Sequence, residues 1–398
     1  MPTMSCPEWV RDLNLWSDRV MHADPYPRYA ELRNACPVAH SDALGGHWLV
    51  TKHADIVRIL LDPVTFSSVT KTVPPFEDPL GVQIPGEVDG LEHTRYRQSV
   101  LSMFSPERVG EMESTAREIM QRLIARVGPP GFEFVHTIAI PYVFEMIMHT
   151  FGIPAEHHAM VMEWEDGGLR KAPHDPELTQ EMGRFLARLI AERRDNPLAE
   201  PRDLLDHLAT ARFDGERLLT FDEAVRIAVF VLKAGLHTTV NALGNCMCFL
   251  VEHPDLRDLL LADPNHLPHV LEELMRWESI LVITRTATRD VEIDGNLVRE
   301  GEHLLLLTGS AGRDSEAFER ADEFDITRRN VNHLMFGVGP HRCVGRHLAR
   351  LELRIALEEI HRLLPTYRGD PDRPPKRYPA MSRGAKELYL LIDHQGAR

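Results

Sequence analysis

The chain has 398 residues, of which 43% are apolar, and this is enough to bury a sizeable core. Its formal net charge of −15 argues against a general affinity for nucleic acid or for an anionic membrane surface. The five cysteines are scattered and odd in number, and no secretory signal accompanies them, so we expect a reducing compartment and a cytoplasmic protein.

No internal repeat, low-complexity tract or Gly/Ser-rich linker divides the sequence, so we expect a single domain over residues 1–398. In chain order, the residue patterns predict a strand at 47–51, helices over 107–126, 178–194, 221–251 and 266–278, a strand after residue 284, a helix over 344–364 and a last strand at 387–393. This order predicts a mainly α protein with minor β sheets. The longest apolar run near a helix, residues 227–232, is far shorter than the roughly 20 residues of a membrane span, so we expect no membrane anchor.

The helix expected over 221–251 begins with a capping box, Thr220-Phe221-Asp222-Glu223, and Pro254 supplies its stop. The helix is apolar on most faces, which indicates burial. Its centre is different, because Lys233-Ala234-Gly235-Leu236-His237-Thr238-Thr239 places polar and basic groups where a core is expected. Glycine costs about 1 kcal/mol relative to alanine in a helix. The segment therefore indicates either a site, or basic groups that reach the surface and threonines that bond back to carbonyls.

Residues 336–350 read FGVGPHRCVGRHLAR, in which Cys343 lies among glycines and just before a helical pattern. The glycines allow unusual backbone conformations and the close approach of a large group, and a helix N-terminus favours an anion, so we expect a thiolate at Cys343. One thiolate suits an axial ligand of haem iron better than a four-ligand cluster. Two alternatives stay open: an inert or nucleophilic thiol, and a zinc site formed by His333, His341, Cys343 and His347.

The segment FGVGPHRCVG resembles the haem-binding loop of the cytochrome P450 family, F-G-x-G-x-H-x-C-x-G. The matching positions are Phe336, Gly337, Gly339, His341, Cys343 and Gly345. Upstream and in the family's order, AGLHTT resembles the oxygen-activating helix motif, and Glu273-Leu274-Met275-Arg276 resembles E-x-x-R. The resemblance, to the soluble bacterial branch, implies a cytochrome P450-like fold. It places haem b (iron protoporphyrin IX) between the long central helix and the helix after Cys343, with Cys343 as the iron ligand.

The resemblance also implies the other haem contacts. Residues 90–97, GLEHTRYR, resemble the propionate-binding segment through His93 and Arg97, and residues 285–295 resemble the stretch that supplies Arg285. Together with His341, these side chains are donors suited to the two carboxylates of haem. Phe336 is expected beside the sulfur, where an aromatic ring screens the thiolate from water.

Glu273 and Arg276 are three residues apart and hence on one helix face. The segment FDITRR, residues 324–329, resembles the family's stretch before the haem loop, with Arg328 as the expected third member of this ion pair. The group would then hold that stretch against the core. Without the resemblance, a solvated pair would be the simpler interpretation.

The resemblance implies a haem-thiolate monooxygenase, which inserts one oxygen atom of O2 into a small organic substrate. Ala234 and Gly235 are expected to leave room for dioxygen, and Thr238 to hold the proton network. The sequence departs from the family at His237, where an acid is usual, so the proton route stays open, although imidazole can pass protons at neutral pH. Two alternatives remain: a peroxide-driven or non-oxygenating haem-thiolate enzyme, and a haem sensor without turnover.

No flavin or iron–sulfur motif is visible, so the electrons of NAD(P)H are expected through separate partners, a ferredoxin and a ferredoxin reductase. A basic patch on the cysteine side would meet an acidic ferredoxin. Its candidate residues are Arg108, Arg346, His347, Arg350 and Arg354. The alternative is a helix face solvated by charge. We expect a monomer that binds neither nucleic acid nor membrane.

Lys233 lies where the family commonly has an apolar pocket residue. If its ammonium ends in the pocket, an acidic or strongly polar substrate would neutralise it, with Phe230, Leu281 and Val282 as apolar walls. In the alternative, the side chain extends to water or pairs with an acidic group.

Overall fold

The computed structural model describes residues 6–69, 72–164, 175–329, 331–378 and 381–392. Helices dominate the fold, as the periodicity predicted. They are α1 (Arg19–Ala23), α2 (Tyr26–Ala35), α3 (His53–Leu61), α4 (Gly90–Leu101), α5 (Pro106–Gly110), α6 (Glu113–Ile124), α7 (Ile140–Phe151), α8 (His158–Glu163), α9 (Pro176–Asp195), α10 (Leu204–Thr210), α11 (Phe221–Glu252), α12 (Pro254–Ala262), α13 (Leu267–Trp277), α14 (Thr308–Ala311) and α15 (Arg346–Leu363).

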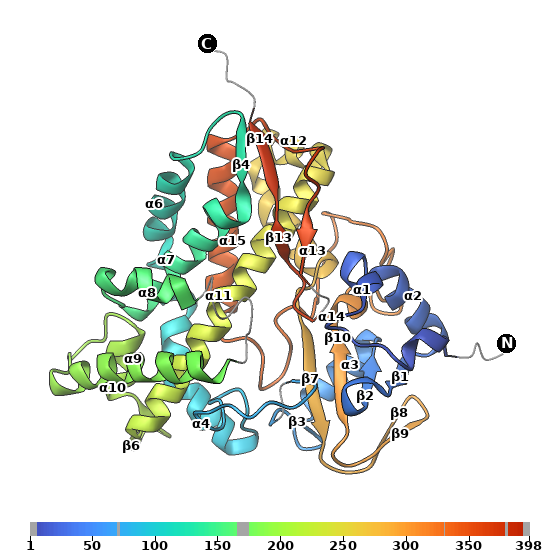
Figure 1. Cartoon of the computed structure of the whole chain (residues 1–398), viewed down its shortest axis with the longest axis horizontal. Coiled ribbons are helices and arrows are strands. Elements are labelled where there is room, and N and C mark those ends of the chain that lie inside the picture. The colour runs from blue at the N-terminus through green and yellow to red at the C-terminus, as the bar shows by residue number, and fades with distance from the viewer. Residues whose placement is uncertain (1–5, 70–71, 165–174, 330, 379–380, 393–398) are drawn as a thin grey trace.

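The largest sheet has the strand order β1-β2-β10-β7-β3 and lies beside the N-terminal helices, on the side of the molecule away from α6 to α10 (Figure 1). Its strands are β1 (Val38–Ser41), β2 (His47–Val50), β3 (Phe66–Ser67), β7 (Val282–Ala287) and β10 (His303–Leu307). Strand β10 pairs antiparallel with β7, with Leu304 opposite Arg285. This pairing holds β7, the strand that carries Val282 and Arg285.

The other sheets are small. A three-stranded sheet has the order β11-β14-β4, and three further pairs are hairpins or ribbons. Their strands are β4 (Gly131–Glu133), β5 (Arg212–Phe213), β6 (Arg217–Leu218), β8 (Val291–Ile293), β9 (Asn296–Val298), β11 (Tyr367–Gly369), β12 (Lys376–Arg377), β13 (Ala385–Glu387) and β14 (Tyr389–Ile392). The predicted strand at 387–393 corresponds to β14, and residue 393 lies outside the described residues.

Helix α11 crosses the helical part of the molecule from end to end (Figure 1). The capping box at Thr220 and Glu223 is present, and α12 begins at Pro254, as predicted. With 32 residues at about 1.5 Å each, the helix is about 48 Å long. Within the described part of the chain it is the one helix whose length and composition alone would suit a membrane span. However, 67% of its most apolar window is buried, as in the core helix of a soluble protein.

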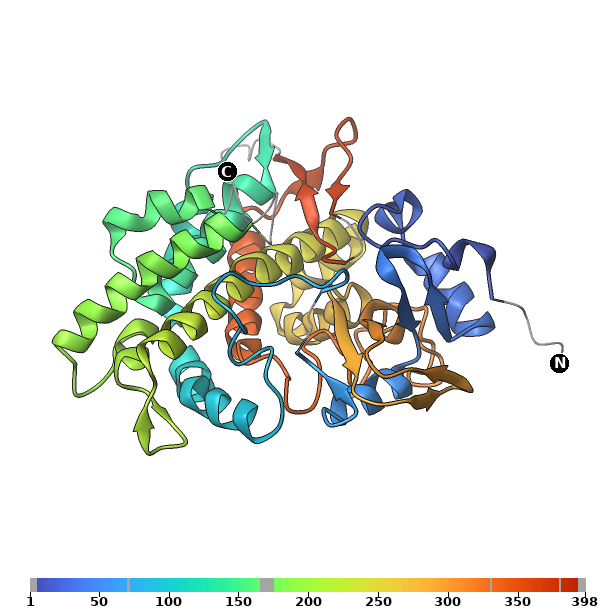
Figure 2. The same ribbon diagram turned by 60° about the horizontal axis from the view of Figure 1, so that its bottom comes forward.

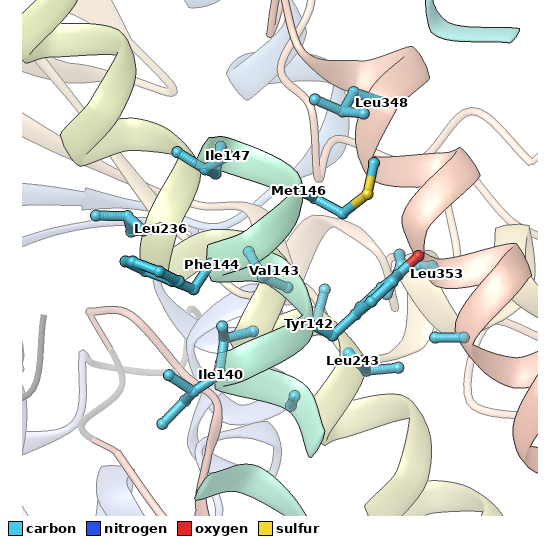
Figure 3. Packing of buried hydrophobic residues seen from close by; sticks show 14 of the residues in the cluster. Ile140, Tyr142, Val143, Phe144, Met146, Ile147, Leu236, Leu243, Leu348 and Leu353 are labelled. Carbon is cyan, nitrogen blue, oxygen red and sulfur yellow. The ribbon is translucent and has the colours of Figure 1, made fainter. Parts of the chain in front are cut away.

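Helix α7 fills the space between α11 and α15 (Figure 3). Ile147 lies toward Leu236 of α11, whereas Met146 and Tyr142 lie toward α15. The hydroxyl of buried Tyr142 donates to the carbonyl oxygen of Glu352, at 3.1 Å. These contacts hold α11 and α15 at a fixed separation, in which the candidate site is formed.

Cys6 and Cys36 form a disulfide, with their Cα atoms 5.1 Å apart, although the cysteine spacing indicated a reducing compartment. Cys36 caps the end of α2, and packing of the N-terminal segment brings Cys6 beside it. Sequence separation alone does not reveal such an encounter. The cysteines Cys246, Cys248 and Cys343 are free thiols.

Candidate functional site

A cavity of about 480 Å³ lies between α11, β7 and the loop that leads into α15. It brings together side chains from distant parts of the sequence. Of the residues singled out from the sequence, those that line it are Phe230, Ala234, Gly235, Thr238, Leu281, Val282, Arg285, Phe336, Gly337, His341, Cys343 and Gly345. The candidate haem loop and the candidate oxygen-activating segment therefore face one space.

The loop before α15 is a tight turn closed by a hydrogen bond from Cys343 N to Phe336 O, at 2.8 Å. Gly337 and Gly339 have φ of +63° and +75°, a region that favours glycine. A Cβ at Gly339 would lie 2.6 Å from Leu60 O. Gly345 needs no such freedom, because it is the N-cap of α15 with φ of −79° and an added Cβ would meet open space.

Cys343 lies deep in the molecule, yet its side chain is accessible from the cavity. Burial raises the pKa of its thiol, although the amide of Gly345 and the charge of Arg97 act in the opposite direction. The expected stabilisation by backbone amides is therefore too weak by itself to keep the Cys343 thiol ionised. A cation bound at the sulfur would supply the missing stabilisation.

Of the four expected propionate donors, Arg285 and His341 line the cavity, whereas His93 and Arg97 lie outside its lining but close to these two side chains. His93 stacks on His341 with ring centroids 3.9 Å apart, and burial lowers the pKa of His93 to about 4. The guanidinium of Arg97 donates to Arg342 O, beside Cys343. Arg285 is buried and donates to the carbonyl of the adjacent Thr284, at 2.8 Å; burial lowers its pKa to about 10.

Two features of this group of side chains fit an anionic cofactor. His93 Nδ1 is buried and has no hydrogen-bond partner within the described ranges. Arg285 is a buried cation whose electrostatic partner is Asp89, a residue that sequence reasoning missed. Buried cations and orphaned donors are costly unless an anion satisfies them. The residues present therefore fit a group with two carboxylates, such as haem, whose iron would lie at Cys343.

Asp89 organises this group of side chains from just before α4. Its carboxylate accepts from His341 Nε2 at 2.9 Å, from Ser67 Oγ at 2.6 Å and from Ser68 N at 3.0 Å. Burial acts to raise its pKa, but these hydrogen bonds prevail and lower it to about 2. Its only sequence signal is its place before the segment containing His93.

The centre of α11 contributes Ala234, Gly235 and Thr238 to the cavity. The Thr238 hydroxyl donates to Ala234 O at 3.0 Å, which is the back-bonding alternative considered from the sequence. A Cβ at Gly235 would lie 2.5 Å from Ile147 Cδ1, so this glycine also lets α7 approach. His237 lies outside the set of residues that line the cavity, and its expected role as a proton relay stays a prediction.

Lys233 also lies outside the cavity lining. Its ammonium donates to Thr179 Oγ1 at 3.2 Å and lies 3.7 Å from Asp78 Oδ2. Burial lowers the pKa of Lys233, and the charge of Asp78 opposes this shift. The structure thus corresponds to the alternative in which the lysine pairs with an acidic group. The expectation of an acidic substrate depended on a Lys233 ammonium in the cavity, and the structure does not place it there. The three expected apolar wall residues, Phe230, Leu281 and Val282, do line the cavity.

Glu352 of α15 was not recognised from the sequence, although it lines the cavity. Its carboxyl is buried, and burial raises its pKa to about 8, while a hydrogen bond with the Thr239 side chain acts to lower it. Its Oε1 has no hydrogen-bond partner among the described residues. The sequence signal that could have identified Glu352 is its position as an acidic residue on the apolar face of α15, which also carries Leu348 and Ile355.

Glu273, Arg276 and Arg328 come together as their spacing indicated. Arg276 contacts both carboxylate oxygens of Glu273, at 2.7 and 2.9 Å, and Arg328 Nε lies 3.3 Å from Glu273 Oε1. Arg276 also donates to the carbonyls of Ala321 and Glu323, each at 2.8 Å. The cluster thus ties the stretch before the haem loop to α13.

The expected basic patch is largely neutralised by acidic neighbours. Arg350 pairs with Glu272 at 2.5 Å, Arg354 with Glu113 at 2.7 Å and Arg108 with Glu111 at 2.8 Å. Burial and the nearby arginines lower the pKa of His347, which favours its neutral form. Of the arginines in the expected patch, Arg346 has no acidic partner among the described residues, and the charge of the exposed Arg342 acts on it.

The zinc alternative has no support in the geometry. In the part of the chain that the structure describes, no group of three or more His, Cys, Asp or Glu side chains could hold a metal ion. His333 contacts Glu272 at 3.2 Å, and His341 contacts Asp89. Cys343 is therefore a candidate for a single-thiolate ligand and not for a member of a zinc cluster.

Known proteins match this chain over most of its length. A family profile described as Cytochrome P450 matches residues 174–382. Putative cytochrome P450 126 of Mycobacterium tuberculosis is 34% identical over 340 residues, 81% of this chain and 82% of that protein. Mycinamicin IV hydroxylase/epoxidase of Micromonospora griseorubida is 33% identical over 355 residues, 86% of this chain and 88% of that protein. A solved structure of a mutant of P450 EryK in complex with erythromycin B has a TM-score of 0.83 at 30% identity, covering 95% of this chain and 99% of that chain.

Proposed function

This chain belongs to the cytochrome P450 family, and we propose that its cavity is the active site at which a haem-thiolate monooxygenase oxidises a small, largely apolar organic substrate. The observation that carries the proposal is that Cys343 opens onto the same cavity as Ala234, Gly235 and Thr238. A thiolate ligand for the iron and a thin, hydroxyl-bearing helix segment that share one cavity are the groups that this chemistry requires.

Haem b, when bound, supplies the activation of O2 and the transfer of one oxygen atom to a substrate C–H bond. Cys343 would bind the iron through its sulfur, and the basic side chains would bind the two carboxylates. Those side chains are His93, Arg97, Arg285 and His341. Phe336 shields the sulfur side of the loop, with the guanidinium of Arg350 4.6 Å from its ring.

Two side chains of the cavity can hold protons where the reaction needs them. The Thr238 hydroxyl faces the cavity while bonded to Ala234 O. Glu352 keeps its proton at neutral pH because burial raises its pKa to about 8. We propose that these two groups, rather than His237, present protons to the cavity.

The substrate proposal follows from the cavity wall. Phe230, Leu281 and Val282 present apolar surface, and the ammonium of Lys233 is engaged with Asp78 and Thr179 instead. Apolar walls favour a substrate that buries hydrocarbon surface. We therefore replace the expectation of an acidic substrate with that of a largely apolar one.

For electron supply, we propose a separate ferredoxin, reduced by a ferredoxin reductase with NAD(P)H. The supporting surface is the pair Arg342 and Arg346, next to Cys343, on a protein with a net charge of −15. A small basic area on an acidic protein would orient an acidic partner.

We also propose that residues 1–398 work as one cytoplasmic, monomeric unit. The single unit is supported by the cavity wall, which draws on residues from Leu60 to Leu353, so that dividing the chain within this range would leave the wall incomplete.

The proposed function is tested by optical spectroscopy and turnover of the haem-loaded protein. The reduced protein with carbon monoxide should show the red-shifted absorption of a thiolate-ligated haem, and Cys343→Ser should lose it. With ferredoxin, reductase and NADPH, apolar compounds that shift the haem spectrum should give products that carry one oxygen atom from O2. Turnover with peroxide alone would instead support the peroxide-driven alternative, and zinc in place of haem would contradict the proposal.

A further inference from the structure

Residues 72–89, which we call the strap, connect the largest sheet with α4 without forming a helix or a strand. Figure 2 shows this blue segment passing in front of α11 in the middle of the molecule. Gly86 in the strap and Ser68 just before it line the cavity. The strap is therefore part of the cavity wall.

Both ends of the strap are fastened by hydrogen bonds. Near its start, Trp16 Nε1 donates to Val73 O at 2.9 Å. At its end, Asp89 accepts from Ser67 Oγ at 2.6 Å and from Ser68 N at 3.0 Å. Motion of the strap would therefore be concentrated in its middle.

The middle of the strap is fastened to two helices by the ion pair of Asp78 with Lys233. Lys233 comes from α11, and its ammonium also binds Thr179 in the first turns of α9. The Asp78 carboxylate additionally accepts from Gln83 Nε2 at 2.7 Å and from Leu80 N at 2.9 Å. One lysine thus joins the strap, α9 and α11.

This ion pair is largely shielded from water, since the side chains of Lys233 and Asp78 are 13% and 4% exposed. A buried charge that loses its partner is costly, so each member holds the other in place. Other contacts add to it: Leu80 packs on Gly183 of α9, where an added Cβ would lie 3.0 Å from it, Ile84 is 3% exposed in the core, and Arg226 donates to Val82 O at 3.4 Å. Among these contacts the ion pair is the one in which a single buried charge joins the middle of the strap to both α9 and α11.

We propose that Lys233, Asp78 and Thr179 are positioning residues that hold the strap closed over the cavity and thereby set how fast a substrate enters and leaves. Lys233, which occupies a position where the family commonly has an apolar pocket residue, would then act on the cavity wall and not on the substrate. The inference rests on the proposed function only in taking the cavity as the substrate site.

The first test measures amide hydrogen–deuterium exchange in the strap. Lys233→Met keeps the length of the side chain and removes its charge, and Asp78→Asn keeps the shape of the other partner. In both variants we expect exchange over residues 72–89 to become about tenfold faster, the effect of about 1.4 kcal/mol on a local opening equilibrium. Lys52→Met, which breaks the pair of Lys52 with Glu316, is the matched control and should leave the strap unchanged.

The double variant Lys233→Met/Asp78→Asn distinguishes the loss of this specific ion pair from a general loss of stability. No unpaired buried charge remains in it, so its strap should exchange no faster than that of the faster single variant. Unchanged exchange in both single variants would overturn the proposal. An equal acceleration over the whole molecule would also overturn it, because the residues would then act on global stability.

The second test follows ligand kinetics at the haem. A bulky phenyl-substituted imidazole should bind and dissociate faster in Lys233→Met and Asp78→Asn than in the parent protein, whereas imidazole itself should change less. Thr179→Val should show a smaller effect in the same direction, because the ion pair remains. Ligand rates that stay constant despite a faster-exchanging strap would overturn the role in entry. The exchange experiment needs no turnover, so it gives its answer even if the proposed function fails.

Discussion

Thr238 and His237 are neighbours on α11, but Thr238 lines the cavity and His237 does not. Consecutive helical residues point about 100° apart, and the packing of α7 decides which of them faces the interior space. The sequence could therefore locate the segment but not assign the two side chains. The resemblance favoured both as catalytic residues, and the geometry supports Thr238.

This difference predicts separate effects on the coupling of reductant use to product. Thr238→Val should lower the product formed per NADPH and raise peroxide release, by up to the roughly 10²-fold that a positioned proton donor contributes. His237→Asn should leave the ratio nearly unchanged, because its side chain is outside the cavity. The measurement is product and peroxide per NADPH consumed. A larger loss of coupling in His237→Asn than in Thr238→Val would restore His237 as the relay.

Lys233 and Glu352 show why single residues are hard to interpret from sequence. Both are ionisable groups in apolar helices, and the sequence analysis singled out Lys233 and missed Glu352. Their roles depend on partners far along the chain: Asp78 for Lys233, and Thr239 for Glu352. Motif positions such as Cys343 need no such knowledge, because their neighbours in the sequence are also their neighbours in space.

At the scale of elements, periodicity found the helices that have one apolar face. The predicted helix over 344–364 is α15, and that over 266–278 is α13. Helix α7 was not predicted, although its apolar residues recur at helical spacing, as in Val143, Met146 and Ile147; what distinguishes it from α15 is that it carries few polar residues. The predicted helix over 107–126 is divided into α5 and α6, because the chain leaves the helix after Gly110.

The cluster on α13 predicts a large effect on stability. Arg276 and Glu273 are 0% and 1% exposed, and the pair shares its carboxylate with Arg328. Glu273→Gln leaves buried cations without their anion, so we expect the free energy of unfolding to fall by about 3–5 kcal/mol. Urea unfolding followed by circular dichroism measures this change. As a control, Arg299→Gln breaks an exposed pair with Asp290 and should cost less than about 1 kcal/mol. A similar small cost for Glu273→Gln would contradict the structural role.

At the scale of the whole molecule, the sequence predicted the distribution of charge less well than the fold. The net charge is −15, and acidic side chains form ion pairs with most arginines of the expected basic patch. Arg342 and Arg346, near the cysteine loop, are the basic side chains of this area outside those pairs. Such pairing depends on contacts between α13, α6 and α15, which residue patterns do not contain. The site itself was easier to predict, since its chemistry is concentrated in short motifs.

The burial of Glu352 gives the whole molecule a pH-dependent stability. Desolvation between α11 and α15 raises its pKa from 4.5 to about 8. Between these two values the unfolded chain has lost the proton that the folded protein keeps. The free energy of unfolding therefore falls by about 1.4 kcal/mol for each pH unit as the pH rises through this window, and this contribution is constant above about pH 8.

Glu352→Gln removes this titration while keeping the shape of the side chain. We expect the variant to unfold at a higher urea concentration than the parent at pH 8, and the two proteins to differ much less at pH 5, where the carboxyl is mostly protonated in the folded protein and close to its pKa in the unfolded chain. The measurement is the urea midpoint of each protein at several pH values between 5 and 8. A difference that does not grow with pH would show that Glu352 is ionised in the folded protein, and it could then not hold a proton for the reaction.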